Sequence, residues 1–133
     1  MIFEKLDESY ILTVVITTHM RPIKLTAKFK IKPGNLEAFK AVIPKIIAEV
    51  MENDPGTVVY EWYLNEKIME CVVWEVYEDS ESVLVHTGNV GAYLDQLSEL
   101  SDPSIEIYGD PSQELVDAAE GLGIKIYPFV DGI

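Results

Sequence analysis

Apolar and polar side chains alternate over residues 23–31, where every second residue is apolar and lysine or threonine lies between. That period of two is typical of a strand with one covered face. Pro33-Gly34 ends the strand, and from residue 35 to about residue 53 the apolar positions recur at steps of three and four. This second pattern predicts an amphipathic helix. Pro44 lies inside the helix, and we expect it to kink or divide it.

Residues 57–64 and 69–77 are rich in valine, tyrosine and tryptophan and are separated by four residues, which predicts a hairpin of two strands. We assume that the turn places Leu64 opposite Met69. This register decides which side chains of the hairpin face the helices, and a slip of one residue would exchange the two sides. The side expected to face the helices carries Val58, Tyr60, Trp62, Leu64, Met69, Cys71, Val73, Glu75 and Tyr77.

A second helical region begins after Asp79, with Ser80 as the expected cap. Gly88-Asn89 is expected to interrupt this helix, and residues 104–108 form a fourth strand. The order of elements is therefore strand, helix, strand, strand, helix, strand. That order predicts an α+β fold, with a ferredoxin-like βαββαβ antiparallel sheet and helices on one face.

Both ends of the chain extend beyond this core. The apolar, β-branched segment Tyr10–Ile16 predicts an extra N-terminal strand and is too short to span a membrane. Residues 113–119 predict a third helix, and residues 124–130 a final extended segment. We therefore expect one domain over residues 1–133, with an N-terminal extension at 1–20, a core at 22–109 and a C-terminal extension at 110–133.

The hairpin has large apolar side chains on both faces, but two helices can cover only one of them. The uncovered face needs a partner, and a second copy of the same chain is the simplest one, because symmetric dimers are the commonest oligomers. The sequence therefore predicts a homodimer whose sheets press together. The alternative is a monomer covered by its own C-terminal tail.

The net charge is −13, and it is distributed unevenly along the chain. Between Lys67 and Lys125 there is no lysine or arginine, whereas thirteen acidic residues lie there. Such a surface repels phosphate, so nucleic acid is not an expected partner. The single cysteine, Cys71, excludes an intrachain disulfide, and the cytoplasm is the expected compartment.

His86 is the candidate functional residue that the pattern singles out, because it lies on the apolar stripe of the second helical region. It should point toward Glu75 on the hairpin. The aromatic residues expected near this pair are Tyr60, Trp62, Tyr77 and Tyr93. An apolar cleft with a few convergent polar groups is typical of a small-molecule site. The alternative is a structural core, in which His86 and Glu75 only hold helix to sheet. No set of residues suggests a metal site.

Four segments resemble the antibiotic biosynthesis monooxygenase family. They are KFKIKPG at residues 28–34, DPGTVVY at 54–60, VWEVYED at 73–79, and His86. The resemblance implies a dimeric α/β barrel, and an activity among cofactor-free oxygenases of polycyclic phenols, quinol oxygenases and haem-degrading relatives. The haem-degrading type has an asparagine on the first strand and a histidine late in the second helix. This chain has Ala27 and Lys28 where that asparagine would be sought, and His86 comes early in the second helix. We therefore do not expect haem cleavage.

The function expected from pattern and resemblance together is that of a cofactor-independent monooxygenase acting on a small aromatic or quinone-type substrate. His86 would remove a proton, since its ordinary pKa lies near neutrality. Glu75 would orient the imidazole or act as the base itself, and Tyr60, Trp62, Tyr77 and Tyr93 would contact the substrate. Two alternatives remain open: a dimeric protein that binds a small hydrophobic molecule without changing it, and an isomerase or lyase that uses the same base without O2.

Overall fold

The computed structural model describes Glu8 and residues 21–133. The predicted strand at residues 10–16 lies outside these described residues. The elements follow in the order β1 (Ile23–Ile31), α2 (Leu36–Asn53), β2 (Thr57–Asn65), β3 (Glu70–Tyr77), α3 (Ser80–Leu100), β4 (Ser101–Tyr108), α4 (Gln113–Gly121) and β5 (Lys125–Tyr127). This order confirms the ferredoxin-like α+β prediction and the C-terminal helix and strand. β4 begins at Ser101, three residues before the predicted start.

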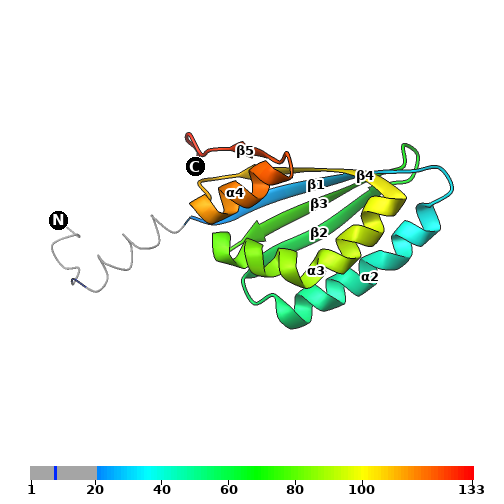
Figure 1. Cartoon of the computed structure of the whole chain (residues 1–133), viewed down its shortest axis with the longest axis horizontal. Coiled ribbons are helices and arrows are strands. Elements are labelled where there is room, and N and C mark those ends of the chain that lie inside the picture. The colour runs from blue at the N-terminus through cyan, green and yellow to red at the C-terminus, as the bar shows by residue number, and fades with distance from the viewer. Residues whose placement is uncertain (1–7, 9–20) are drawn as a thin grey trace.

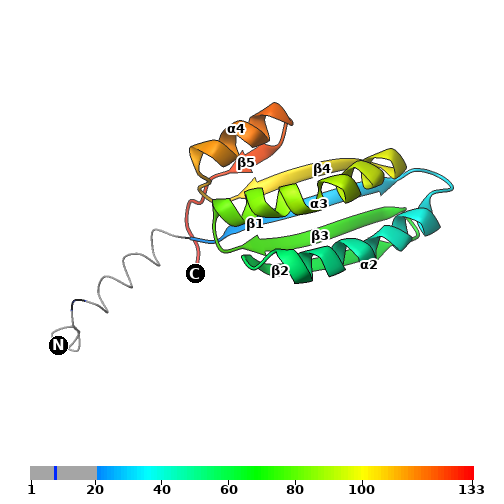
Figure 2. The ribbon, with the colours of Figure 1, turned by 60° about the horizontal axis from the view of Figure 1, so that its bottom comes forward.

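One sheet forms the centre of the molecule, with the strand order β2-β3-β1-β4-β5. Neighbouring strands are antiparallel, except that β5 runs parallel to β4. α2 and α3 lie side by side across one face of this sheet, and α4 lies beyond β4, next to β5 (Figures 1 and 2). We call the face of the sheet away from α2 and α3 the outer face. No helix in the described part of the chain is long and apolar enough to cross a bilayer.

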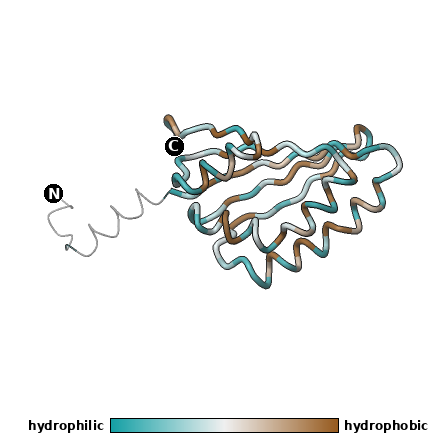
Figure 3. The backbone as a smooth tube through the Cα atoms, in the orientation of Figure 1, coloured by the Kyte–Doolittle hydropathy of each residue, from teal (hydrophilic) through white to brown (hydrophobic). Residues whose placement is uncertain are grey.

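The core lies between the sheet and the two long helices. Phe29 of β1 packs edge-on against Phe39 of α2, with ring centroids 5.5 Å apart, and stacks on Trp62 of β2 at 6.0 Å. Ile46 of α2 and Leu97 of α3 are fully buried on the same side. Figure 3 shows apolar and polar segments alternating along each helix, as the predicted amphipathic pattern requires.

The hairpin register differs from the prediction by two residues: Leu64 pairs with Cys71 rather than with Met69. A shift of two keeps each side chain on its predicted face, because the side-chain period of a strand is two. Val58 is the exception. The register shifts between Thr57 and Val59, and Val58 is 60% exposed instead of facing the helices. A bulge of this kind adds a residue and breaks the alternation locally.

Neither long helix is interrupted where the sequence suggested. Pro44 does not divide α2, and Gly88-Asn89 does not interrupt α3. α2 buries Val42 and Ile46 on either side of Pro44, and α3 buries His86 and Val90 on either side of the Gly88-Asn89 pair. A glycine inside a helix costs only about 1 kcal/mol relative to alanine, so burial on both sides outweighs it.

The cap of α3 is Asp79 rather than the predicted Ser80. Its carboxylate accepts hydrogen bonds from the backbone N–H and the hydroxyl of Ser82, both at 2.8 Å. Ser80 instead accepts a hydrogen bond from the backbone N–H of Ser112, ahead of α4. We expect Asp79→Ala to lower the free energy of unfolding by about 1 kcal/mol, the usual cost of losing a helix cap. Urea unfolding checks this, and Ser80→Ala is the matched control, with a smaller expected loss.

Candidate functional site

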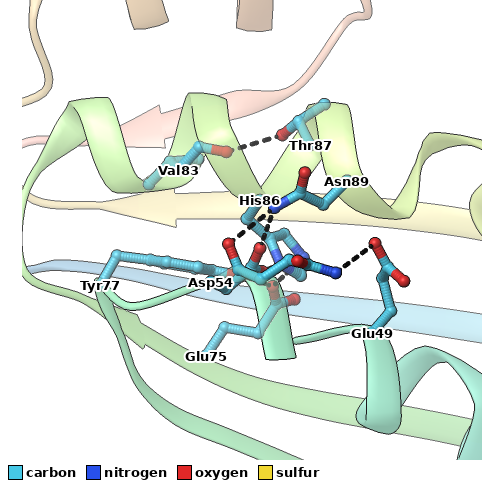
Figure 4. A network of polar contacts seen from close by, with 9 residues as sticks. Glu49, Asp54, Glu75, Tyr77, Val83, His86, Thr87 and Asn89 are labelled. Carbon is cyan, nitrogen blue, oxygen red and sulfur yellow. Dashed lines mark hydrogen bonds and ion pairs between the residues drawn. The ribbon is translucent and has the colours of Figure 1, made fainter. Parts of the chain in front are cut away.

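The polar centre of the core forms where α2 ends beneath α3. Asp54 caps the C-terminus of α2, His86 points down from the buried stripe of α3, and Glu75 points up from β3 (Figure 4). All three side chains are at most 7% exposed. Buried ionisable groups are rare unless they interact with one another, so their contacts decide what the group can do.

Asp54 fixes the imidazole of His86. Its Oδ2 lies 2.6 Å from His86 Nδ1, and its Oδ1 accepts a hydrogen bond from the amide of Asn89 (Figure 4). The same Asn89 amide nitrogen donates to the backbone carbonyl of Asn53 at 3.1 Å. A carboxylate can only accept, so Nδ1 carries the hydrogen in this pair. In the neutral imidazole, Nε2 is then left with a free lone pair.

The turn Asp54-Pro55-Gly56 brings the carboxylate to this place. Gly56 lies against the first turn of α3, where an added Cβ would come within 2.0 Å of Ser82 Oγ. Asp79 holds that hydroxyl in place, so any larger residue at position 56 would push the turn away from α3. The glycine therefore allows the close approach that places Asp54 against His86.

On its other side, His86 faces Glu75. The distance from Nε2 to Glu75 Oε1 is 3.6 Å, and that oxygen also accepts a hydrogen bond from the Tyr77 hydroxyl. Burial raises the pKa of Glu75 to about 7, and the bond from Tyr77 opposes part of this rise. Burial lowers the pKa of His86, against the opposing effect of Asp54. Near neutral pH the imidazole is therefore neutral, beside a carboxyl group that exchanges a proton readily.

Two tyrosine rings enclose the imidazole. The ring centroids of Tyr60 and Tyr77 lie 5.1 and 5.2 Å from that of His86. Burial raises the pKa of both hydroxyls above the ordinary value, with further increases from the nearby carboxylates. Both tyrosines therefore stay protonated at physiological pH and surround the imidazole with uncharged hydroxyl groups and apolar ring faces.

A cleft of about 50 Å³ opens beside this group. Of the predicted site residues, Tyr60, Trp62, Glu75 and His86 line it. The remaining lining is mostly apolar and includes Leu25, Ala27, Phe29, Val73, Leu94 and Ile105. This volume holds a few water molecules, whereas small-molecule sites span roughly 300–1,000 Å³. A ring-sized ligand would therefore require the lining side chains to move apart.

The two other predicted site residues, Tyr77 and Tyr93, do not line the cleft. Tyr77 lies behind Glu75 and holds its carboxyl group, and Tyr93 packs against the main hydrophobic core outside the cleft. Sequence reasoning missed Asp54 and Asn89, because the Asp-Pro-Gly triplet counted only toward the family resemblance and Asn89 only as an expected helix interruption. Cys71 is buried, and burial raises the pKa of its thiol to about 11, so the thiol stays protonated at neutral pH.

The sequence model of the antibiotic biosynthesis monooxygenase family matches residues 22–106. The chain belongs to this family. The resemblance seen in the sequence is thereby confirmed. A comparison with curated proteins found no match. Within the described part of the chain, no group of three or more histidine, cysteine, aspartate or glutamate side chains is placed to hold a metal ion.

Solved structures show the same fold. MupZ from Pseudomonas fluorescens is 21% identical, with a TM-score of 0.72, and the match covers 85% of this chain and 93% of MupZ. Rv0793 from Mycobacterium tuberculosis is also 21% identical, with a TM-score of 0.61, over 70% of this chain and 98% of Rv0793. A mutant of SnoaB, a cofactor-independent oxygenase from Streptomyces nogalater, is 16% identical, with a TM-score of 0.57, over 69% of this chain and 95% of SnoaB.

Because of Glu75, this family member should lose stability as pH rises from about 4.5 to about 7. The pKa of Glu75 lies near 7 in the folded chain and at 4.5 in the unfolded one, so its contribution is full below about pH 4.5 and is lost toward pH 7. Glutamine does not ionise. We therefore expect Glu75→Gln to gain in melting temperature relative to the wild type between pH 5 and pH 8.

His86 acts in the opposite direction in this experiment. Its pKa is lowered from 6.5, so its contribution is present above that value and is lost as pH falls through the folded pKa. Both proteins keep His86, so this effect largely cancels in the difference between them. A difference in melting temperature that stays constant across the pH range would show that Glu75 is not protonated in the folded chain.

Proposed function

We propose that this protein is a cofactor-independent monooxygenase of small aromatic, phenolic or quinol-type substrates. One observation carries the proposal: Asp54 holds His86 by Nδ1, so that Nε2 is a free base inside an apolar, aromatic cleft. A base is the part that such chemistry needs from the protein, because the electron-rich anion that it produces can itself reduce O2. The family and the likeness to a cofactor-independent oxygenase agree with this reading.

For an anthrone-type substrate, His86 Nε2 removes a proton from the CH2 group beside the rings. The carbanion transfers one electron to O2, and the two radicals combine into a C–O bond, which gives a peroxide anion. Glu75 protonates that anion and then removes the second C–H proton. The O–O bond breaks, and hydroxide leaves with the proton held on His86. The sum is CH2 + O2 → C=O + H2O, with both residues back in their first states.

The environment of each group suits its step. The lowered pKa of His86 keeps the base free at neutral pH, and the pKa of Glu75 near 7 allows it to give and take a proton. Tyr60 and Trp62 provide aromatic faces at an angle to each other, with ring centroids 5.7 Å apart, against which a flat substrate can pack.

The test is O2 uptake with a panel of anthrones and hydroquinones, measured in air and under argon. We expect uptake of one O2 for each substrate consumed in air, and no reaction under argon. Conversion that continues under argon would show an isomerase or lyase instead. Thermal stabilisation by the panel without any product would show a binding protein.

We also propose that the protein is a homodimer that joins through the outer face of β2 and β3. Trp74 is 50% exposed there and Tyr63 53%, next to the partly buried Val72 and Val76. Exposed aromatic residues that cluster on a sheet favour an interface. We propose a location in the cytoplasm, because the single cysteine, Cys71, is a free thiol and disulfides are rare in that compartment.

Changing Trp74 to lysine should convert the dimer to a monomer, because a charge would be buried where an aromatic ring packs. Sedimentation velocity at micromolar concentration measures this. Val85→Lys is the matched control, since Val85 is an exposed apolar residue on α3, on the opposite side of the molecule. A wild type that sediments as a monomer would contradict the proposal, and so would a Trp74→Lys variant that stays dimeric.

A further inference from the structure

A second and larger hollow lies at the end of the sheet where β1 begins and β4 ends. Its volume is about 340 Å³, which is within the range of small-molecule sites. Lys24 of β1 and Tyr108 of β4 are cross-strand partners in its lining, whereas their neighbours Leu25 and Ile107 are buried toward the helices. The hollow therefore opens on the outer face, with the sheet between it and the His86 cleft.

Aromatic rings form its walls. Tyr108 and Tyr127, on the parallel pair β4 and β5, stack with centroids 5.4 Å apart and an angle of 19° between their planes. Phe129, from the segment after β5, lies under Arg21, whose guanidinium carbon is 4.2 Å from the ring centroid. The lining of the hollow therefore offers aromatic ring surface against which a planar ring can pack.

The charge of the lining is the opposite of the charge of the molecule. The chain has 23 acidic and 10 basic residues, yet the lining includes Arg21 and Lys24 and no aspartate or glutamate. The structure shows one nearby carboxylate, Glu106, in contact with the lining. It accepts a hydrogen bond from the hydroxyl group of Tyr108. Among the described residues, neither Arg21 nor Lys24 forms an ion pair.

A guanidinium stacked on a ring keeps its N–H edge free, and that edge matches a carboxylate in a two-pronged contact. We propose that this hollow is a second small-molecule site, which binds a planar aromatic ring that carries a carboxylate or a similar anionic group. The ring would lie along the Tyr108–Tyr127 stack, and its anion would meet Arg21 and Lys24. The inference does not depend on the proposed oxygenase function.

The test uses 2-naphthoate as the probe and the neutral 2-naphthamide as its matched analogue, titrated into the full-length protein. Calorimetry gives the affinity, and ¹H–¹⁵N spectra give the place. We expect 2-naphthoate to bind at least about tenfold more tightly than the amide, the loss of one charge-assisted contact. The amides of Gly109 and Val130, which line the hollow, should shift, and those around His86 should not.

Two variants and a control test whether the probe binds at this site or is attracted by any positive charge on the surface. Arg21→Gln should weaken 2-naphthoate binding by about tenfold or more, and Lys24→Gln by less, because lysine lacks the two-pronged geometry. Lys30→Gln, an exposed lysine on the same side of β1, should change nothing. The proposal is overturned if full-length protein does not bind the probe at millimolar concentration, if Arg21→Gln binds as the wild type does, or if the shifts gather around His86.

Discussion

His86→Ala should lower O2-dependent turnover of an anthrone or hydroquinone by about 10²–10⁴-fold, the usual contribution of a positioned general base. The alanine variant keeps Asp54 and Glu75 but lacks the imidazole that takes the first proton from the substrate. The loss should fall on kcat, because the apolar and aromatic lining that would bind the substrate stays in place. Steady-state O2 uptake at saturating substrate measures it.

The chain contains one other histidine, His19, which is the matched control for a change of imidazole to methyl. We expect His19→Ala to turn over as the wild type does. Circular dichroism and thermal unfolding of both variants separate lost chemistry from lost folding, since removing His86 leaves Asp54 buried with one fewer partner. Equal turnover in His86→Ala and wild type would remove His86 from the mechanism.

Asp54→Asn should lower the plateau of kcat/KM on the order of 10²-fold or more, by analogy with the aspartate that orients the histidine in Ser-His-Asp enzymes. Asparagine can turn its NH2 group toward Nδ1, which favours the wrong imidazole tautomer. Asp54 also raises the pKa of His86 against the effect of burial. Its removal should therefore move the acidic limb of the pH–rate profile to lower pH.

The shift of that limb separates a role in positioning the base from a role in packing alone. If Asp54 only held α2 to α3, its loss would lower the rate and leave the limb where it is. Asn89→Ala is the graded control: it removes one hydrogen bond to Asp54 but keeps the contact between Asp54 and His86. We expect it to lower the rate less than Asp54→Asn does and to leave the limb almost unmoved.

The sequence was sufficient for the fold because the core depends on periodic patterns. The alternation over residues 23–31 and the helical spacing after Asn35 each identify one covered face, and their order leaves few topologies. The register was wrong by two residues, yet Glu75 still came out facing His86, because a shift of two preserves the side. A single-residue irregularity has no such protection, and Val58 in the bulge was therefore misplaced.

The polar part of the site was harder to predict, because it depends on how helix ends meet. Asp54 and His86 are 32 positions apart, and their contact requires the C-terminus of α2 to pass under the second turn of α3. Asn89 takes part only because α3 continues through Gly88. The placement of Tyr93 depends on rotation around the helix axis, and a broad apolar stripe does not define that rotation.

The central claim is that Asp54 holds His86 so that Nε2 is the free base at neutral pH. A long-range ¹H–¹⁵N spectrum of the wild-type protein at pH 7, with ¹⁵N-labelled histidine, tests it without any substrate. The account predicts a neutral imidazole with its hydrogen on Nδ1 and an unprotonated Nε2. A hydrogen on Nε2, in either the neutral ring or the imidazolium, would contradict it.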